Sequence, residues 1–162
     1  ITVILIMNSL TERDNHYMGL ALDAAVQAFQ NNEVPIGAVV VDQTGELLGC
    51  GFNRIEASFS QNYHAEVNAI NQACLKRKDW RLSSCTLYVT LEPCMMCISL
   101  CALSRIERIV YGASSPLFGF TLDKEGVLRL YSRQIKSITS GVRAAEAATL
   151  LKVFFKKERN RE

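Results

Sequence analysis

Residues 85–97 read CTLYVTLEPCMMC, a strand pattern that runs directly into the start of a helix. Cys85 to Leu91 is rich in β-forming residues and predicts a buried strand. Glu92-Pro93 ends that strand, and the proline suits the first turn of a helix because its missing amide donor costs nothing there. The helix is expected to run to about residue 103, and residues 106–111 predict a second strand. So short a strand, helix and strand unit predicts a right-handed crossover with both strands parallel in one sheet.

The segments on either side of this unit complete the predicted order of elements. Met18, Leu22, Ala25 and Phe29 recur every three or four positions, which is typical of an amphipathic helix. A β-branched run, a turn with a glycine and a second apolar run then predict a hairpin. We expect a helix over 11–30, strands over 36–41 and 47–52, a loop over 54–63, a helix over 64–78, the unit above, a loop over 114–126 near the mouth of the site, and a final helix over 142–157.

Three side chains suit a zinc ion. Cys94 and Cys97 are three residues apart at the start of one predicted helix, and His64 begins another. One imidazole and two thiolates leave a fourth position for water, which is the ligand count of a catalytic zinc site. A Cys-x-x-Cys pair alone would equally suit a redox pair or two buried small residues. Histidine occurs only at positions 16 and 64, so His64 is almost the only imidazole available to complete a site.

Glu66 lies two residues after His64, beside the predicted metal without needing to bind it. Together these residues match the pattern H-x-E…P-C-x-x-C, which is the signature of the zinc deaminases. Deamination of an aminated heterocycle needs a group that carries protons from water to the ring and to the departing amine, and we expect Glu66 to be that group. Cys101 is a possible fourth ligand, but a closed set of four would leave no place for water, so we expect it to pack in the core.

The composition is that of a globular protein with a local, and not a general, basic surface. The chain has 162 residues, of which 49% are hydrophobic and 21% charged, and its net charge is only +2. We expect one domain over residues 1–162, in which 142–162 form the last helix and a basic tail. Six unevenly spaced cysteines without a secretory leader indicate a reducing compartment, and therefore the cytoplasm. Residues 1–10 are expected to be a flexible or extraneous extension. Their apolar run is too short to span a bilayer, and Met7 is a candidate for the true start.

The chain resembles the bacterial tRNA-specific adenosine deaminases, which convert the wobble adenosine of a tRNA anticodon to inosine. The likeness covers about residues 15–157. The motif with two methionines between the cysteines, followed by Ser104-Arg105-Ile106, is closer to the tRNA enzymes than to nucleoside or nucleotide deaminases. The matching segments are Val34–Val39, Gly51–Arg54, His64–Glu66, Leu87–Cys97, Ser104–Ile106 and Val110–Ala113.

The resemblance implies a three-layer, cytidine-deaminase-like α/β fold with a central mixed sheet of about five strands flanked by helices. It implies one Zn²⁺ per subunit, a homodimer with substrate sites near the subunit interface, and a tRNA anticodon stem-loop as partner, with no membrane. His64, Cys94 and Cys97 would be the ligands and Glu66 the proton carrier. The residues implied for substrate binding are Asn53, Ala65, Pro93, Phe154, Phe155 and Lys156. Two loops depart from the family pattern, at Ser60–Tyr63 and Ser114–Pro116, and both are expected to border the RNA.

Three other functions fit parts of the pattern. A deaminase of a free base or nucleotide, such as guanine or deoxycytidylate, would use the same metal and the same glutamate. A zinc-bearing or RNA-binding module without catalysis would have no use for the carboxylate of Glu66. A thiol redox protein would not hold one zinc per chain through mild oxidation. The basic last helix favours RNA over a small molecule.

Overall fold

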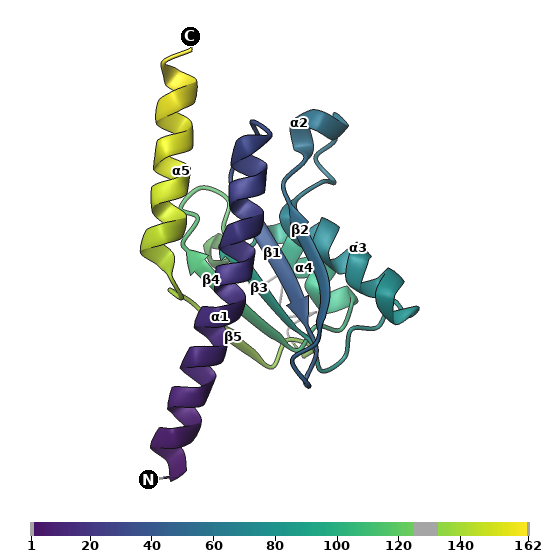
Figure 1. Cartoon of the computed structure of the whole chain (residues 1–162). Helices are drawn as coiled ribbons and strands as arrows, with labels where there is room; N and C mark the ends of the chain where they lie inside the picture. Colours follow the sequence, from purple (N-terminus) through teal and green to yellow (C-terminus); the bar gives the residue numbers. More distant parts are fainter. Residues whose placement is uncertain (1, 125–132, 162) are drawn as a thin grey trace.

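The computed structural model describes residues 2–124 and 133–161, with side chains from residue 10 onward. Five strands form one mixed sheet in the order β2-β1-β3-β4-β5, and helices cover both faces (Figure 1). This is the predicted three-layer α/β fold. The strands are β1 Gly37–Val41, β2 Leu47–Phe52, β3 Thr86–Leu91, β4 Arg108–Ala113 and β5 Ser137–Thr139, and the longer helices are α1 Thr2–Gln30, α3 Ala65–Arg77, α4 Met95–Leu103 and α5 Ala144–Arg159.

The strand directions confirm the two pairings predicted from the sequence. β1 and β2 form an antiparallel hairpin, in which Val39 lies opposite Cys50. β3 and β4, which precede and follow α4 along the chain, pair in parallel, and Tyr88 lies opposite Val110. β1 joins the hairpin to this crossover unit by pairing antiparallel with β3. The ends of β3 and of the connection before α3 therefore meet at one edge of the sheet, where both metal-binding segments begin.

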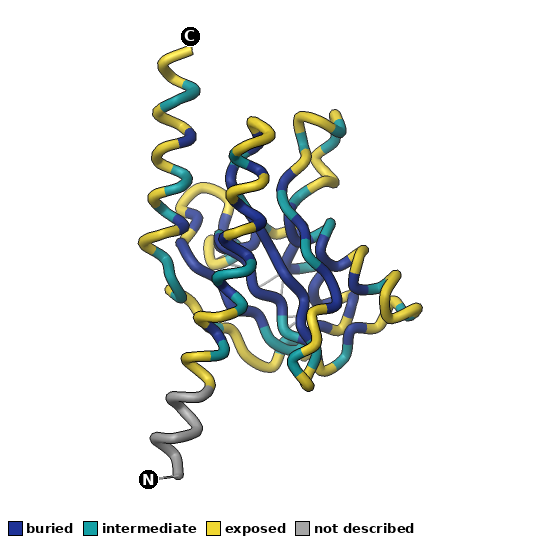
Figure 2. Tube along the Cα trace, in the orientation of Figure 1, coloured by how far each residue is buried: buried dark blue, intermediate teal, exposed yellow. Residues whose placement is uncertain are grey.

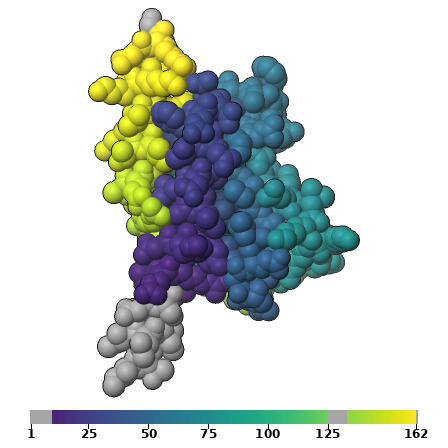
Figure 3. Space-filling model, in the orientation of Figure 1, coloured from purple at the N-terminus to yellow at the C-terminus, as the bar shows by residue number. Residues whose placement is uncertain are grey.

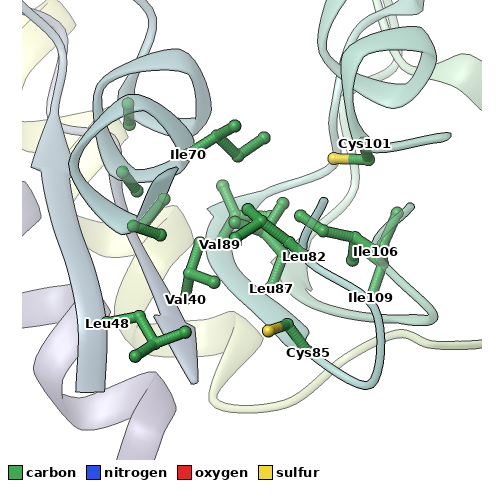
Figure 4. Close-up of a cluster of buried hydrophobic side chains, with 14 of the residues drawn as sticks. Val40, Leu48, Ile70, Leu82, Cys85, Leu87, Val89, Cys101, Ile106 and Ile109 are labelled. Carbon is green, nitrogen blue, oxygen red and sulfur yellow. The ribbon is translucent and has the colours of Figure 1, made fainter. Parts of the chain in front are cut away.

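Successive side chains along the strands point to opposite faces of the sheet and form an apolar layer on each face. Val40, Leu87 and Ile109 face α3 and α4, whereas Val39, Tyr88 and Val110 face α1 and α5. Figure 2 shows that the buried residues concentrate in the sheet and on the inner sides of the helices. The α3 and α4 layer, part of which is drawn in Figure 4, also contains Cys85 and Cys101 as small buried side chains. Strict alternation of inward-facing residues is what fixes the register of each strand.

Helix α3 packs unusually close to β2 because β2 carries glycines on the facing side. A Cβ atom added at Gly51 would lie 2.5 Å from the carbonyl oxygen of Ala65 and 2.5 Å from the amide nitrogen of Ala69. A Cβ at Gly49 would lie 2.1 Å from the carbonyl oxygen of Ala69. Only glycine allows the helix backbone to approach the strand this closely. The position of the residues at the start of α3 is therefore set directly by the sheet.

A buried ion pair joins α1 to the opposite end of the sheet. Arg108 donates to both oxygens of Asp14, at 2.7 and 2.6 Å, and the hydroxyl of Tyr88 donates to the same carboxylate at 3.0 Å. Arg108 also donates to the hydroxyl of Thr139 on β5 at 3.2 Å. This network satisfies a buried carboxylate with two charge-assisted hydrogen bonds, which fixes α1 against β3, β4 and β5.

Several boundaries differ from those predicted. α1 begins at Thr2, within residues 1–10, and the expectation that these residues are a flexible or extraneous extension stays a prediction. The expected loop over 54–63 contains a short helix, α2 Ile55–Ser58. The expected loop over 114–126 contains a turn of 3-10 helix, η1 Phe120–Leu122, while its last two residues lie outside the described ones. β5 is an edge strand that the sequence did not predict.

Despite the length of α1, no helix within the described ranges has an apolar stretch sufficient to cross a lipid bilayer.

Candidate active site

The three predicted ligands come together at the edge of the sheet. Nδ1 of His64 lies 3.7 Å from Sγ of Cys94 and 3.5 Å from Sγ of Cys97, and all three ligand atoms lie within 4.8 Å of one another. A tetrahedral zinc ion with Zn–N of about 2.0–2.1 Å and Zn–S of about 2.3 Å holds such atoms about 3.6 Å apart. The spacing and the donor set therefore fit one zinc ion.

The ligands lie at the N-terminal ends of two helices. His64 is the residue before α3 and Cys94 the residue before α4, and both have extended backbone angles. Neither side chain caps its own helix. The amide of Ala65 instead donates to Oδ1 of Asn53 at 2.9 Å, so the asparagine caps α3 and leaves the imidazole available for metal. The positive end of the α4 dipole favours the thiolate of Cys94, the residue directly before that helix.

Glu66 lies in the first turn of α3 and is only 4% exposed. Burial raises the pKa of its carboxyl above the usual value, although a backbone hydrogen bond, His64 and a hydrogen bond with Cys97 act in the opposite direction. A carboxyl can accept a proton in its ionised form and return that proton in its neutral form, which is the task of a general acid and base. The arrangement therefore offers a proton carrier beside the three ligands.

The cysteines differ in their suitability as ligands. Hydrogen bonds with Cys97 and His64 outweigh burial and lower the pKa of the Cys94 thiol to about 4. The thiolate, which is the form that binds zinc, is thus favoured at this position. Cys101 lies in the core, beside Ile106 (Figure 4), and does not belong to the metal-binding group found among the described residues. The expectation that Cys101 packs in the core is confirmed.

The structure brings three of the residues implied for substrate binding to the metal group. Asn53 is buried and bonded to Ala65, which follows the ligand histidine. Pro93 precedes Cys94, and its carbonyl oxygen accepts a hydrogen bond from the amide of Phe120 at 2.9 Å. The sequence did not indicate that the side chain of Asn53 also caps α3, because that contact depends on how β2 ends against the helix.

The other three implied residues lie on α5 and differ in exposure. Phe154 is 5% exposed and packs edge to face on Phe29 of α1, with ring centroids 6.0 Å apart. Phe154 thus anchors α5 against α1, and a role for this residue in substrate binding stays a prediction. Phe155 and Lys156 are exposed. A cavity of about 530 Å³ separates this part of α5 from the loop that leads to His64, and its lining includes Phe154, Glu158, Ile55, Glu56 and Gln61.

A second cavity, of about 440 Å³, lies beside Cys94. One wall is the start of α4, and the other is the loop that follows β4, as expected for a loop near the mouth of the site. Leu117 and Phe118 on this loop are 77% and 74% exposed. Glu92, which the sequence did not single out as a site residue, is buried and hydrogen-bonded to this loop. The signal for it was a charged residue at the end of an apolar strand, directly before the cysteine motif. The cavity is lined by Cys94, Met95, Met96, Leu117, Phe118, Gly119, Leu122 and Asp123.

Comparisons with known proteins agree with this geometry. The family described as "Cytidine and deoxycytidylate deaminase zinc-binding region" matches residues 11–113. The chain is 38% identical over 154 residues to the tRNA-specific adenosine deaminase of Streptococcus pyogenes, and the match covers 93% of this chain and 95% of that protein. It is also 40% identical over 144 residues to tRNA(Ile)-lysidine synthase of Deinococcus deserti, of which it spans only 27% of the length.

Solved structures show the same fold. A structure from studies of A-to-I editing by tRNA:A34 deaminases matches with a TM-score of 0.75 and 37% identity, over 84% of this chain and 99% of that one. Guanine deaminase from Bacillus subtilis matches with a TM-score of 0.57 and 31% identity, over 61% of this chain and 63% of that one. The His-Cys-Cys group fits zinc, and the matches cover most of the chain. The chain therefore belongs to the zinc-dependent cytidine and deoxycytidylate deaminase family, and within it to the tRNA-specific adenosine deaminases.

Proposed function

We propose that this chain catalyses the hydrolytic deamination of adenosine to inosine at the wobble position of a tRNA anticodon. The main observation that supports the proposal is the group of His64, Cys94 and Cys97 with the buried carboxyl of Glu66 beside it. Three protein ligands and an adjacent proton carrier are what a metal-assisted hydrolysis requires. The relatives named for adenosine deamination on tRNA support the choice of substrate.

Each residue has a role in this reaction. His64, Cys94 and Cys97 hold zinc, which supplies the Lewis acidity that makes water a nucleophile near neutral pH. Glu66 accepts a proton from the attacking water and delivers it to the ring nitrogen of adenine. Glu66 then takes the second proton of that water from the new hydroxyl on the ring carbon and delivers it to the exocyclic amine, which leaves as ammonia while inosine remains in the RNA. Asn53 offers an amide that can donate to the nucleotide while its oxygen caps α3.

The anticodon loop would lie along α5 and the segment that leads to His64. α5 packs beside α1, with α2 on the other side of α1 (Figure 3). Lys157 of α5 and Arg161, which follows α5, both donate to Oδ1 of Asn32, just after the end of α1. Cations on this side of the molecule suit the phosphates of an RNA loop, and exposed Phe155 suits a base. The cations on α5 and its tail are Lys152, Lys156, Lys157, Arg159 and Arg161.

A homodimer is proposed from the apolar surface beside the site. Met95, Met96, Leu117 and Phe118 are all exposed and lie around one cavity next to Cys94. Contiguous apolar side chains of this kind mark protein interfaces, and a second copy of this chain would cover them. Sedimentation equilibrium should give twice the mass of one chain, and Met96→Lys should shift the protein toward monomer. A wild-type monomer at micromolar concentration would contradict the proposal.

A cytoplasmic location is proposed from the cysteines. All six are free thiols, including the two that would bind zinc. Reducing compartments keep thiols in this state.

The rival function is deamination of a free base or nucleotide, which the likeness to guanine deaminase favours. The two functions share the metal site and differ in the substrate. We expect the zinc-loaded protein to release ammonia from an anticodon stem-loop with adenosine at the wobble position, and to leave free adenosine, guanine and deoxycytidylate unchanged. Ammonia from the small molecules alone would reverse the assignment. The matched control is the same stem-loop with guanosine at the wobble position.

A further inference from the structure

Glu92 is a buried carboxylate that the proposed reaction does not use. It stands between β3 and the cysteine motif and is 4% exposed. Within residues 2–124 and 133–161, no arginine, lysine or histidine forms an ion pair with it. A buried charge without a cation is costly unless hydrogen bonds replace its water. Glu92 must therefore be stabilised by donors from elsewhere in the chain.

Among the described residues, the side-chain oxygens of Glu92 accept hydrogen bonds from the segment after β4. The amide of Ser115 donates to Oε2 of Glu92 at 2.9 Å. The amide and the hydroxyl of Thr121 donate to Oε1 at 3.0 and 2.6 Å. One carboxylate thus binds both ends of residues 115–121, and hydrogen bonds to a charged acceptor are about twice as strong as neutral ones.

Backbone contacts hold the same loop along the metal-binding segment. The amide of Phe120 donates to the carbonyl of Pro93 at 2.9 Å, and Gly119 forms a β-bridge with Cys94. A Cβ atom at Gly119 would lie 2.3 Å from Cδ of Glu92, so the loop closes directly over the carboxylate. The loop, the carboxylate and a metal ligand are therefore one connected unit.

The held loop is a wall of the cavity beside Cys94. Leu117 and Phe118, between the two points bound to Glu92, face that cavity across from Met95 and Met96. Leu117 and Phe118 are largely exposed in the single chain, so few packing contacts within the chain fix their position. The shape of this wall depends on the hydrogen bonds at the ends of the loop.

We propose that Glu92 is a positioning residue that holds residues 115–121 as a wall of the substrate site. It acts through the loop and does not touch the reacting atoms. The inference rests on the proposed function, because it assigns the cavity beside Cys94 to the substrate. It predicts that loosening the loop weakens substrate binding while the zinc ligands stay in place.

The test is Glu92→Gln, which replaces one acceptor oxygen by a donor. Whichever oxygen is lost, the amide of Ser115 or of Thr121 loses its acceptor. We expect the variant to bind one zinc per chain and the amides of Ser115 and Thr121 to exchange hydrogen about tenfold faster, as for the loss of a charged hydrogen bond. We expect KM for the stem-loop to rise about fivefold or more and kcat to change less than about twofold, as for a loss of binding shared by ground and transition states.

Two further variants complete the design. Thr121→Val removes only the hydroxyl donor and should shift exchange and KM in the same direction by a smaller amount, which tests the inference even if Glu92→Gln fails to fold. Glu107→Gln, which loses a carboxylate paired with Lys136 on the surface, is the control and should leave both values unchanged. Unchanged exchange, or faster exchange with the wild-type KM, would overturn the inference. Failure of the proposed function is distinguishable, because it appears as a wild-type protein inactive on the stem-loop.

Discussion

At the scale of single residues, Glu66 separates metal binding from turnover. It is buried beside the ligands but does not belong to the group that fits zinc. We expect Glu66→Gln to retain one zinc per chain and to lose about 10²- to 10⁴-fold in kcat, because an amide cannot carry a proton. Metal analysis and ammonia release on the same sample measure both quantities.

Two controls accompany this substitution. Cys94→Ala should lose zinc, because it removes a ligand. Glu46→Gln, at an exposed carboxylate paired with Lys76, should change neither zinc content nor kcat. A zinc-free Glu66→Gln protein would show that Glu66 holds the metal and would contradict the division of roles.

Asn53 combines a structural and a substrate-binding role in one amide. Its oxygen accepts the amide of Ala65, so Asn53→Ala should destabilise the protein by about 0.5–2 kcal/mol through loss of the helix cap. Asn53→Asp keeps an acceptor there and should lose less. Both substitutions remove the amide donor, so KM for the stem-loop should rise in both. Urea unfolding and steady-state kinetics separate the two effects, and a wild-type KM for Asn53→Ala would exclude the substrate contact.

The sequence predicted the ligands better than it predicted the neighbours of the site. Spacing and the scarcity of histidine selected His64, Cys94 and Cys97, since metal chemistry needs those side chains in any fold. The burial of Phe154 could not be predicted in this way. It depends on Phe29 of α1, which is far away in the chain and comes close only when both helices pack on the same face of the sheet.

At the scale of elements, the contact between β2 and α3 sets the position of the site. Gly51→Ala places a Cβ against helix backbone, which cannot move aside as a side-chain end can. We expect it to lower the free energy of unfolding by about 1–3 kcal/mol and to weaken zinc binding, because α3 begins beside His64. Urea unfolding and a zinc competition assay measure the two losses.

The matched control is another glycine with the opposite expectation. At Gly19 in α1, an added Cβ meets only the end of the Arg143 side chain. Gly19→Ala should therefore leave zinc affinity unchanged and stabilise the protein by up to about 1 kcal/mol, since alanine favours the helix. Equal changes in the free energy of unfolding and in zinc affinity for the two substitutions would show that the close contact between α3 and β2 does not set the position of the site.

Elements with strong periodicity were predicted and short ones were not. Long apolar patterns predicted the hairpin, the parallel strand pair and helices α3, α4 and α5. β5 has only three residues, and none of them is buried, so no apolar alternation marks it. α2 has one turn and depends on the buried carboxylate of Glu33, which accepts the amides of Glu56 and Ala57 from a distant part of the chain.

At the scale of the whole molecule, one face of the sheet carries the metal-binding helices, and the other carries the paired helices α1 and α5. The edge where α3 and α4 begin is where the two metal-binding segments meet. Phe154 and Glu158 of α5 line one cavity together with Ile55, Glu56 and Gln61 of the segment that leads to this edge.

The most direct measurement is the recovery of activity on an anticodon stem-loop as zinc is returned to chelated protein. We expect no ammonia release after exhaustive chelation, and recovery in proportion to added zinc until one ion per chain, because the three ligands form one site. Full activity in the chelated protein would contradict a zinc-dependent mechanism, and so would a protein that binds one zinc ion per chain and still leaves the wobble adenosine unchanged.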